Sequence, residues 1–175
     1  MLKGIENAYK YFNYIKVIGV WISGIALFLM MFFIVYDVIL RNLAGDSIRG
    51  GFEIVKNYFM PLVVFPSLAY IYSSGVLPKM DLLIEKFHNK TKMVFIIGML
   101  VIEIVILVLM TQFTWTYAMT GLEREMAFPA AGALYPLYPL FFLIPIAFGM
   151  IVIENVFILL KNIKEKVATF QFKYE

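Results

Sequence analysis

The chain has 175 residues, of which 62% are hydrophobic and 15% are charged, and its formal net charge is +3. Soluble domains carry about 25% charged residues, so this composition excludes a soluble domain and predicts one all-α integral membrane domain over residues 1–175. With no cysteine and one histidine, the chain lacks the ligands for an iron–sulfur cluster, bis-histidine haem or a multi-histidine zinc site, and we expect no cofactor or metal. Nucleic acid is not an expected partner, because the basic residues have a membrane explanation.

Residues 1–16 are the first feature of the chain. Apolar side chains recur there every three or four positions from Leu2 to Phe12, with lysines between them. This pattern is typical of an amphipathic helix that lies in the membrane interface. The apolar run that follows is too long for a signal-peptide core and has no small-residue cleavage site, so we interpret residues 17–39 as a retained first span rather than a cleaved signal.

The first span ends in charged residues. Asp37 and Arg41 are four positions apart, so they can pair across one helical turn. We interpret this pair as an anchor for the end of the helix in preference to a binding site. Residues 42–51 then form a polar turn that contains three glycines.

The second predicted span covers residues 52–72 and contains Pro61 and Pro66. Proline has no backbone N–H, so a bend is expected in this helix. Donors from neighbouring helices must then satisfy the carbonyls that the prolines leave free, because lipid cannot do so.

The third predicted span, residues 93–115, is apolar on every face and carries Glu103 near its midpoint. An ionised carboxylate in the middle of a bilayer costs at least a few kcal/mol unless it is paired or hydrated. Two interpretations stay open: a proton or cation site, and a neutral or hydrogen-bonded glutamate that ties helices together. No basic residue lies deep in any predicted span, and a single acid without further polar groups makes a poor ion path.

The connections on either side of this span differ in character. Residues 73–92 are strongly basic, include Asp81, and could form a short surface helix. Residues 120–133 are a connecting segment with three consecutive charged residues followed by proline and small residues.

The fourth predicted span covers residues 135–160, and Pro145 should kink it. Glu154 lies near its far end, where we expect it at the membrane interface, held by snorkelling lysines such as Lys161. Residues 161–175 form a basic tail.

The lysines and arginines predict the orientation of the four spans. Eleven lie on the side that holds both termini and the middle loop, and four lie on the other side. Because basic residues accumulate on the cytoplasmic side, both termini are predicted to be cytoplasmic. The outward loops then carry five charged residues: Asp46, Arg49, Glu123, Arg124 and Glu125.

The sequence contains no catalytic constellation. There is no serine–histidine pair, no phosphate-binding glycine loop and no carboxylate cluster. Paired glycine-broken half-helices, which build the substrate site of many transporters, are also missing. We therefore expect a scaffold or accessory subunit, and not an enzyme or a complete transporter.

Four short motifs occur in order along the chain. Arg41-Asn42 closes the first span, Gly50-Gly51-Phe52-Glu53 opens the second, Lys79-Met80-Asp81-Leu82-Leu83 follows it, and a stretch centred on Pro145 begins the fourth. In their order and spacing these motifs resemble those of the small membrane subunit of tripartite ATP-independent periplasmic (TRAP) transporters. The chain departs from the family pattern at Asn42, where an aromatic residue is usual, and at Lys79, where histidine is common.

The resemblance implies a function. A periplasmic binding protein would capture an organic acid, such as a sialic acid or a C4-dicarboxylate, and deliver it to a membrane heterodimer. A large, roughly twelve-helix subunit would hold the substrate and sodium sites, while this chain would brace it in the bacterial inner membrane. The five charged residues of the outward loops would help to dock the binding protein, and Arg41, Glu53, Asp81 and Pro145 would be the family-motif positions.

Two other functions remain as alternatives. The chain could be an independent small channel or proton-coupled carrier that uses Glu103. It could also be a membrane enzyme or an enzyme anchor, although it lacks the histidines and cysteines that would hold haem or a metal.

Overall fold

The computed structural model describes residues 2–75, 89–165 and 169. Four of its helical segments are long and apolar enough to cross a membrane, which confirms the four predicted spans: Asn7–Leu43, Gly51–Ser73, Thr91–Glu123 and Tyr138–Lys164.

The first and third spans are single long helices, α1 (Leu2–Ala44) and α5 (Asn89–Glu123). The second span is built from α2 (Gly51–Ile54), a π-helical turn (Val55–Phe59) and α3 (Met60–Ser73). A short hairpin of β1 (Ala127–Ala130) and β2 (Ala133–Pro136) precedes the fourth span, which consists of α6 (Tyr138–Phe141) and α7 (Leu143–Glu165).

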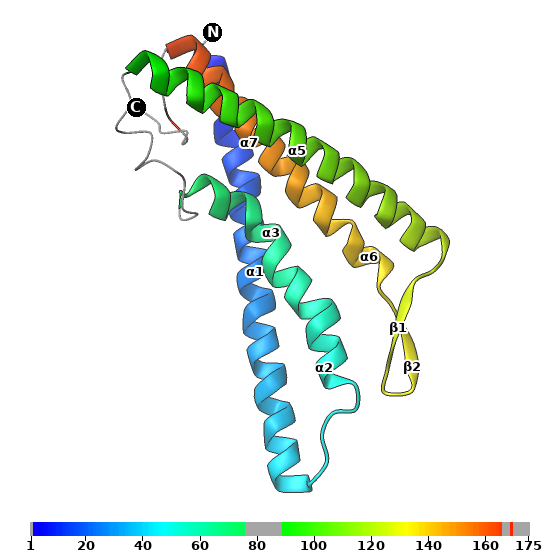
Figure 1. Ribbon diagram of the computed structural model, residues 1–175. Helices are drawn as coiled ribbons and strands as arrows, with labels where there is room; N and C mark the ends of the chain where they lie inside the picture. Colours follow the sequence, from blue (N-terminus) through cyan, green and yellow to red (C-terminus); the bar gives the residue numbers. More distant parts are fainter. Residues whose placement is uncertain (1, 76–88, 166–168, 170–175) are drawn as a thin grey trace.

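The helices pack as two pairs (Figure 1). Helix α1 lies against α3, α5 lies against α7, and α3 joins the pairs through its contact with α7. The N-terminus, the start of α5 and the far end of α7 lie at one end of the molecule. The turn between α1 and α2 and the β-hairpin lie at the other end. This arrangement agrees with the expected number of crossings, while the direction of the bundle across the membrane stays a prediction.

The separate interfacial helix predicted for residues 1–16 is not confirmed. Helix α1 runs without a break from Leu2 to Ala44, so this segment continues directly into the first span. Tyr9, Phe12 and Lys16 are buried, and the Tyr9 and Phe12 rings pack against Phe157 of α7. The described part of the apolar stripe, Tyr9 and Phe12, therefore contacts another helix of the same chain.

The backbone of the second span is irregular next to its first proline. The π-helical turn ends two residues before Pro61, where the regular hydrogen-bond ladder loses a donor. Pro66 leaves the carbonyl of Leu62 without its usual partner, and Ser23 of α1 donates a long hydrogen bond to it, at 3.4 Å. Gly19 allows this close approach, since a Cβ atom there would lie 2.2 Å from the Pro66 oxygen.

The segment before the fourth span forms a β-hairpin, where the sequence predicted only a connecting segment. Its residues pair as an antiparallel hairpin, from Ala127 with Pro136 to Ala130 with Ala133. Ala131 and Gly132 form the turn with positive φ angles of 53° and 82°, the geometry that matches the twist of the strands in a two-residue hairpin. The fourth span accordingly begins at Tyr138 instead of residue 135.

The fourth span is interrupted close to Pro145. The break falls at Phe142, between α6 and α7, three residues before the proline. Its position agrees with the expected effect of Pro145, since proline has no N–H to donate to the carbonyl four residues before it.

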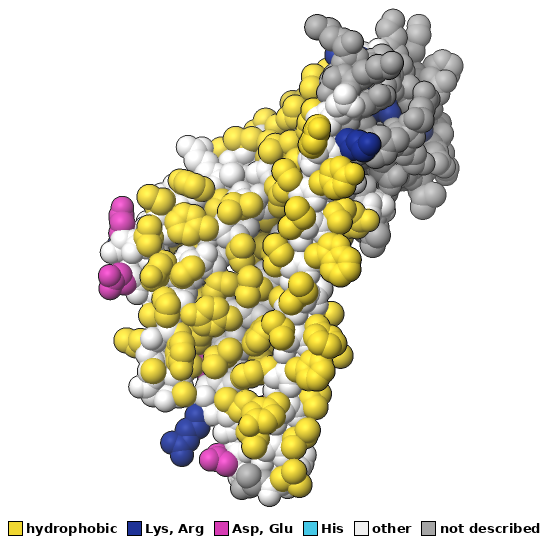
Figure 2. All heavy atoms as spheres, turned by 180° about the vertical axis from the view of Figure 1, so that it is seen from behind, with side chains coloured by type: hydrophobic (Ala, Val, Ile, Leu, Met, Phe, Trp, Pro, Cys, Tyr) yellow, Lys and Arg dark blue, Asp and Glu magenta, His cyan; other side chains and the backbone are white. Residues whose placement is uncertain are grey.

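The outside of the bundle is mostly apolar. Figure 2 shows hydrophobic side chains along the length of the helices on the face in view, with charged side chains at its margins. Two small clusters fill the interior: Ile96 and Leu100 pack on Ile158, and Ala69 and Tyr72 pack on Ile151.

Candidate functional site

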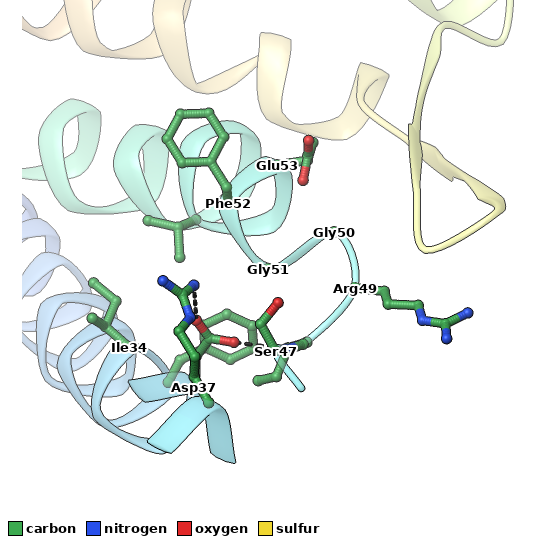
Figure 3. Close-up of a pocket in the computed structure, with 12 residues that line it drawn as sticks. Ile34, Asp37, Ser47, Arg49, Gly50, Gly51, Phe52 and Glu53 are labelled. Carbon is green, nitrogen blue, oxygen red and sulfur yellow. Dashed lines mark hydrogen bonds and ion pairs between the residues drawn. The ribbon is translucent and has the colours of Figure 1, made fainter. Parts of the chain in front are cut away.

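Two groups of polar residues stand out in the structure. One surrounds the turn between α1 and α2, and the other lies between the helices, toward the end that holds the N-terminus. The first group lines a pocket of about 450 Å³ (Figure 3), whose polar lining includes Asp37, Arg41 and Glu53 and whose apolar wall includes Ile34 and Phe52.

Asp37 holds the α1–α2 turn together. Its Oδ1 atom accepts a 2.7 Å hydrogen bond from the backbone N–H of Ile48, and its Oδ2 atom lies 3.2 Å from Nη2 of Arg41. The predicted pair across one helical turn is therefore present. Because 66% of the Arg41 side chain is exposed, such a pair contributes only about 0.2–1 kcal/mol. The bond to the backbone of Ile48 is the contact that fixes the path of the turn.

The pocket brings together two of the predicted motif positions. Arg41 comes from the last turn of α1, and Glu53 comes from the first turn of α2. Arg49 also lines the pocket, although its side chain points away from it (Figure 3). Neither Glu53 nor Arg49 forms an ion pair with any described residue. Their charges are therefore available to a group outside the chain.

The β-hairpin is fastened to this end of the second span. A Cβ atom on Gly50 would lie 2.7 Å from the Ala130 side chain, so only glycine leaves room for the hairpin there, and its φ of 74° also favours glycine. The Tyr58 hydroxyl donates a 2.5 Å hydrogen bond to the carbonyl of Pro136, and the Tyr58 ring packs on Phe128 with centroids 5.4 Å apart. These contacts link the two helix pairs at the end opposite the N-terminus.

The five charged residues predicted for the outward loops are exposed at this same end. Asp46 and Arg49 lie in the α1–α2 turn, whereas Glu123, Arg124 and Glu125 lie where α5 gives way to the hairpin. The five residues therefore belong to two separate loops. Of the five, Arg49 alone lines the pocket.

The two remaining motif positions are not part of this pocket. Pro145 lies in α7. Asp81 lies outside the described residues, as does most of the predicted surface helix around it.

The second group centres on a buried ion pair between Lys16 of α1 and Glu154 of α7. The Lys16 Nζ atom lies 2.7 Å from Glu154 Oε2, and neither side chain is exposed. The Tyr9 hydroxyl donates a 2.6 Å hydrogen bond to Glu154 Oε1, and Lys16 also donates to Tyr9. The aromatic rings of Tyr9 and Phe12 flank the ammonium group at 4.7 and 5.3 Å. This pair ties the first span to the fourth.

The ion pair corrects the prediction for Glu154. The residue is fully buried between helices, and its ion-pair partner is Lys16 rather than the predicted Lys161. Lys16 had been counted only as one of the lysines that orient the chain.

Glu103 also has partners that the sequence did not predict. The hydroxyl of Tyr72, in α3, lies 2.7 Å from Glu103 Oε1 and 2.6 Å from Asn155 Oδ1. A tyrosine hydroxyl carries one proton, so it can donate to only one of these oxygens. The other contact needs a donor from its own side: a protonated Glu103, or an Asn155 amide rotated so that its NH₂ faces Tyr72. As placed, the buried Asn155 Nδ2 atom has no hydrogen-bonding partner among the described residues.

These contacts revise two statements made from the sequence. Tyr72 is one residue from the end of α3, so Glu103 lies level with the end of the second span although it is near the middle of its own. Glu103 is also not an isolated polar group. Glu154, which pairs with Lys16, and Asn155, which contacts Tyr72, are consecutive on α7, so the two sets of contacts adjoin. We call the six residues together the polar layer: Tyr9, Lys16, Tyr72, Glu103, Glu154 and Asn155. All four spans contribute to it, so the prediction that Glu103 lacks polar neighbours is wrong.

The described residues contain no group of three histidines or carboxylates that could hold a metal ion. The polar layer joins helices through paired and hydrogen-bonded groups, and the pocket presents charges at one end of the bundle. The polar layer is therefore suited to holding the helices together, and the pocket is suited to contact with other molecules.

Comparison with known proteins connects this geometry to a family. The family model for the DctQ component of tripartite ATP-independent periplasmic transporters matches residues 30–167. No curated protein and no solved structure gives a significant match. The matched range covers well over half of the chain, from the last third of α1 to beyond the end of α7, and includes the pocket, the hairpin and Glu103. The chain therefore belongs to the DctQ family, the small membrane component of TRAP transporters.

Proposed function

We propose that this chain is the non-catalytic small subunit that braces the large transport subunit of a TRAP transporter and helps to dock its periplasmic substrate-binding protein. The transporter would take up an organic acid of the sialic acid or C4-dicarboxylate type, driven by sodium. The single observation that carries this proposal is the family match over residues 30–167. The class of substrate and the coupling ion come from the resemblance of the sequence motifs to the family.

The packing of the spans supports a bracing role. In the most apolar stretch of each span, only 11–33% of the residues are buried within the chain. Large hydrophobic side chains remain exposed along the helices, among them Phe28 and Phe32 of α1 and Ile102 and Phe113 of α5. Lipid can cover such side chains, but so can the helices of a large membrane partner.

The charged loops support a docking role. In the predicted orientation, with both termini cytoplasmic in the bacterial inner membrane, Asp46, Arg49 and Glu123 to Glu125 face the periplasm. Exposed charges at the rim of an interface change the association rate more than the affinity. Reversing Glu123 and Glu125 to lysine should therefore alter the salt-dependent association rate of the binding protein. Lys10→Glu, at the opposite end of α1, is the control and should leave that rate unchanged.

Co-purification tests the proposal. The tagged chain is extracted from its native membrane in a mild detergent, and the proteins that accompany it are identified by mass spectrometry. We expect a large multi-span permease in stoichiometric amount. A homo-oligomer of this chain without such a permease would contradict the proposal.

The polar layer gives one observation in favour of the alternative function, an independent channel or proton-coupled carrier. Glu103 is hydrogen-bonded to Tyr72 and is not an isolated acid. Reconstitution of the chain alone separates the two functions. A subunit that only braces its partner passes no protons or cations, whereas a carrier would pass them and would lose the flux in Glu103→Gln.

A further inference from the structure

The pocket beside the α1–α2 turn combines charged and apolar groups. Ile34, Asp37 and Arg41 line it from α1, at spacings of three and four residues, which place side chains on one face of a helix. Phe52 and Glu53, at the start of the second span, line it from the other side. Figure 3 shows that the apolar side chains of Ile34 and Phe52 come from the two different helices that border the pocket. A ligand there would meet charges and apolar walls together.

The pocket lies at the depth of the lipid head groups. Arg41 follows the predicted end of the first span by two positions, and Ile34 is seven residues, or about 10 Å, deeper along the helix. The head-group region is about 5–7 Å thick on each side of the hydrocarbon core. The pocket therefore extends from the head groups into the hydrocarbon. Its apolar walls are exposed, by 43% for Ile34 and 76% for Phe52.

The cationic part of the pocket is Arg41. One of its guanidinium nitrogens donates to Asp37 in a weak, exposed pair, which leaves the other N–H donors of the fork available. A guanidinium can bind a phosphate group through two parallel hydrogen bonds. Ser47 also lines the pocket, and its hydroxyl makes no hydrogen bond with a described residue. Both side chains are donors that suit a phosphate group.

Glu53 gives the pocket an opposite charge at a separate place. Its side chain is half-buried, forms no ion pair or hydrogen bond with a described residue, and points away from Asp37 (Figure 3). A partly buried carboxylate without a partner favours the binding of a cation. The lining carries two acidic and two basic residues, so its net charge is zero. Separated charges that sum to zero match a zwitterionic ligand better than an anionic one.

We propose that this pocket binds one molecule of phosphatidylethanolamine from the surrounding bilayer. The phosphate group accepts hydrogen bonds from Arg41, the ammonium group contacts Glu53, and an acyl chain lies against Ile34 and Phe52. A soluble phosphate compound would leave these apolar walls uncovered, which favours a lipid. The primary ammonium group of ethanolamine can donate hydrogen bonds to Glu53, whereas the quaternary ammonium of choline has no N–H.

Native mass spectrometry measures this binding. The full chain is delipidated in detergent and titrated with phosphatidylethanolamine, and we expect one saturable site. Arg41→Gln should weaken the binding by about tenfold or more, because charge-assisted hydrogen bonds to the phosphate group are lost. Arg49→Gln is the matched control. Arg49 lines the same pocket but its side chain points away from it, so the affinity should not change.

Three further measurements identify the ligand. Phosphatidylcholine should bind less tightly than phosphatidylethanolamine, and Glu53→Gln should remove this difference. Glycerophosphoethanolamine, which has the same head group without acyl chains, should compete poorly for the site. Phe52→Ala, at an exposed position that the fold does not depend on, should weaken lipid binding severalfold. This variant and Glu53→Gln decide the matter if Arg41→Gln does not fold.

Several results would overturn the proposal. Equal affinities of Arg41→Gln and the wild-type chain, or an equal loss in Arg49→Gln, would show that Arg41 does not hold the phosphate group. Tight binding of phosphatidylglycerol or phosphatidylcholine would show that the site does not select this zwitterion. Tight binding of glycerophosphoethanolamine would assign the pocket to a soluble ligand, and the absence of a saturable site would leave it to a protein partner. The titration contains no partner protein, so these results are distinct from a failure of the proposed function.

Discussion

The buried pair between Lys16 and Glu154 gives the strongest prediction for stability. Lys16→Met removes the ammonium group but keeps most of the side-chain volume. It leaves the Glu154 carboxylate, which has no exposed surface, with Tyr9 as its remaining donor. Breaking a buried pair by removing one partner costs about 3–5 kcal/mol, because an uncompensated charge stays in the interior. We therefore expect Lys16→Met to lower the free energy of unfolding by about that amount.

The double variant Lys16→Met with Glu154→Gln shows whether charge is the cause. It removes both charges and keeps a side-chain oxygen that accepts the hydrogen bond of Tyr9, so it should recover most of the loss. The assay is unfolding by sodium dodecyl sulfate in mixed micelles, followed by helical circular dichroism. Lys10→Met, at an exposed position six residues before Lys16, is the control. The reasoning is refuted if Lys16→Met is as mild as Lys10→Met, or if the double variant is no more stable than the single one.

Two further substitutions test how the helices are joined. Tyr72→Phe deletes the hydroxyl that contacts both the partly buried Glu103 and the buried Asn155. It should destabilise the chain by about 1–3 kcal/mol in the same assay, because a buried polar group loses its partner. Tyr70→Phe, on an exposed side chain, should have little effect, and equal effects would show that the hydroxyl contacts are unimportant. Gly19→Ala places a methyl group against the α3 backbone and should cost about 1–3 kcal/mol, whereas Gly24→Ala, which has open space, should be neutral or slightly stabilising. A harmless Gly19→Ala would contradict the close approach of α1 and α3.

The sequence predicts the spans well because each depends on its own composition. A run of about 20 apolar residues identifies a membrane helix wherever it occurs. The pair of Asp37 and Arg41 was predicted for the same reason, since the two residues are neighbours on one helix. Such features require no knowledge of how the spans are arranged.

The polar layer could not be predicted in this way. Lys16 and Glu154 are 138 positions apart, and Tyr72 and Glu103 are 31 positions apart in different helices. Their contacts depend on the tilt and rotation of whole spans, which local patterns do not contain. The opposite charges of Lys16 and Glu154 are a usable signal, but Lys16 comes directly before the predicted first span, residues 17–39, and so counts among the basic residues of the cytoplasmic side.

The β-hairpin was missed because its strands resemble a loop in composition. Residues 127–136 are rich in alanine and proline, which are uncommon in strands. Ala131-Gly132 was the one local signal, since glycine favours the positive φ angles of a two-residue turn. The hairpin is held by long-range contacts, from Gly50 and Tyr58, that only the fold reveals.

We propose that this chain supports transport without carrying it out. The most direct test is uptake into proteoliposomes, under a sodium gradient, of the radiolabelled organic acid that the partner binding protein captures. The large subunit and the binding protein are present throughout, and this chain is either included or omitted; a third preparation contains this chain alone. We expect uptake only when all three proteins are present, and none from this chain alone. Full uptake without this chain, or flux through this chain by itself, would contradict the account.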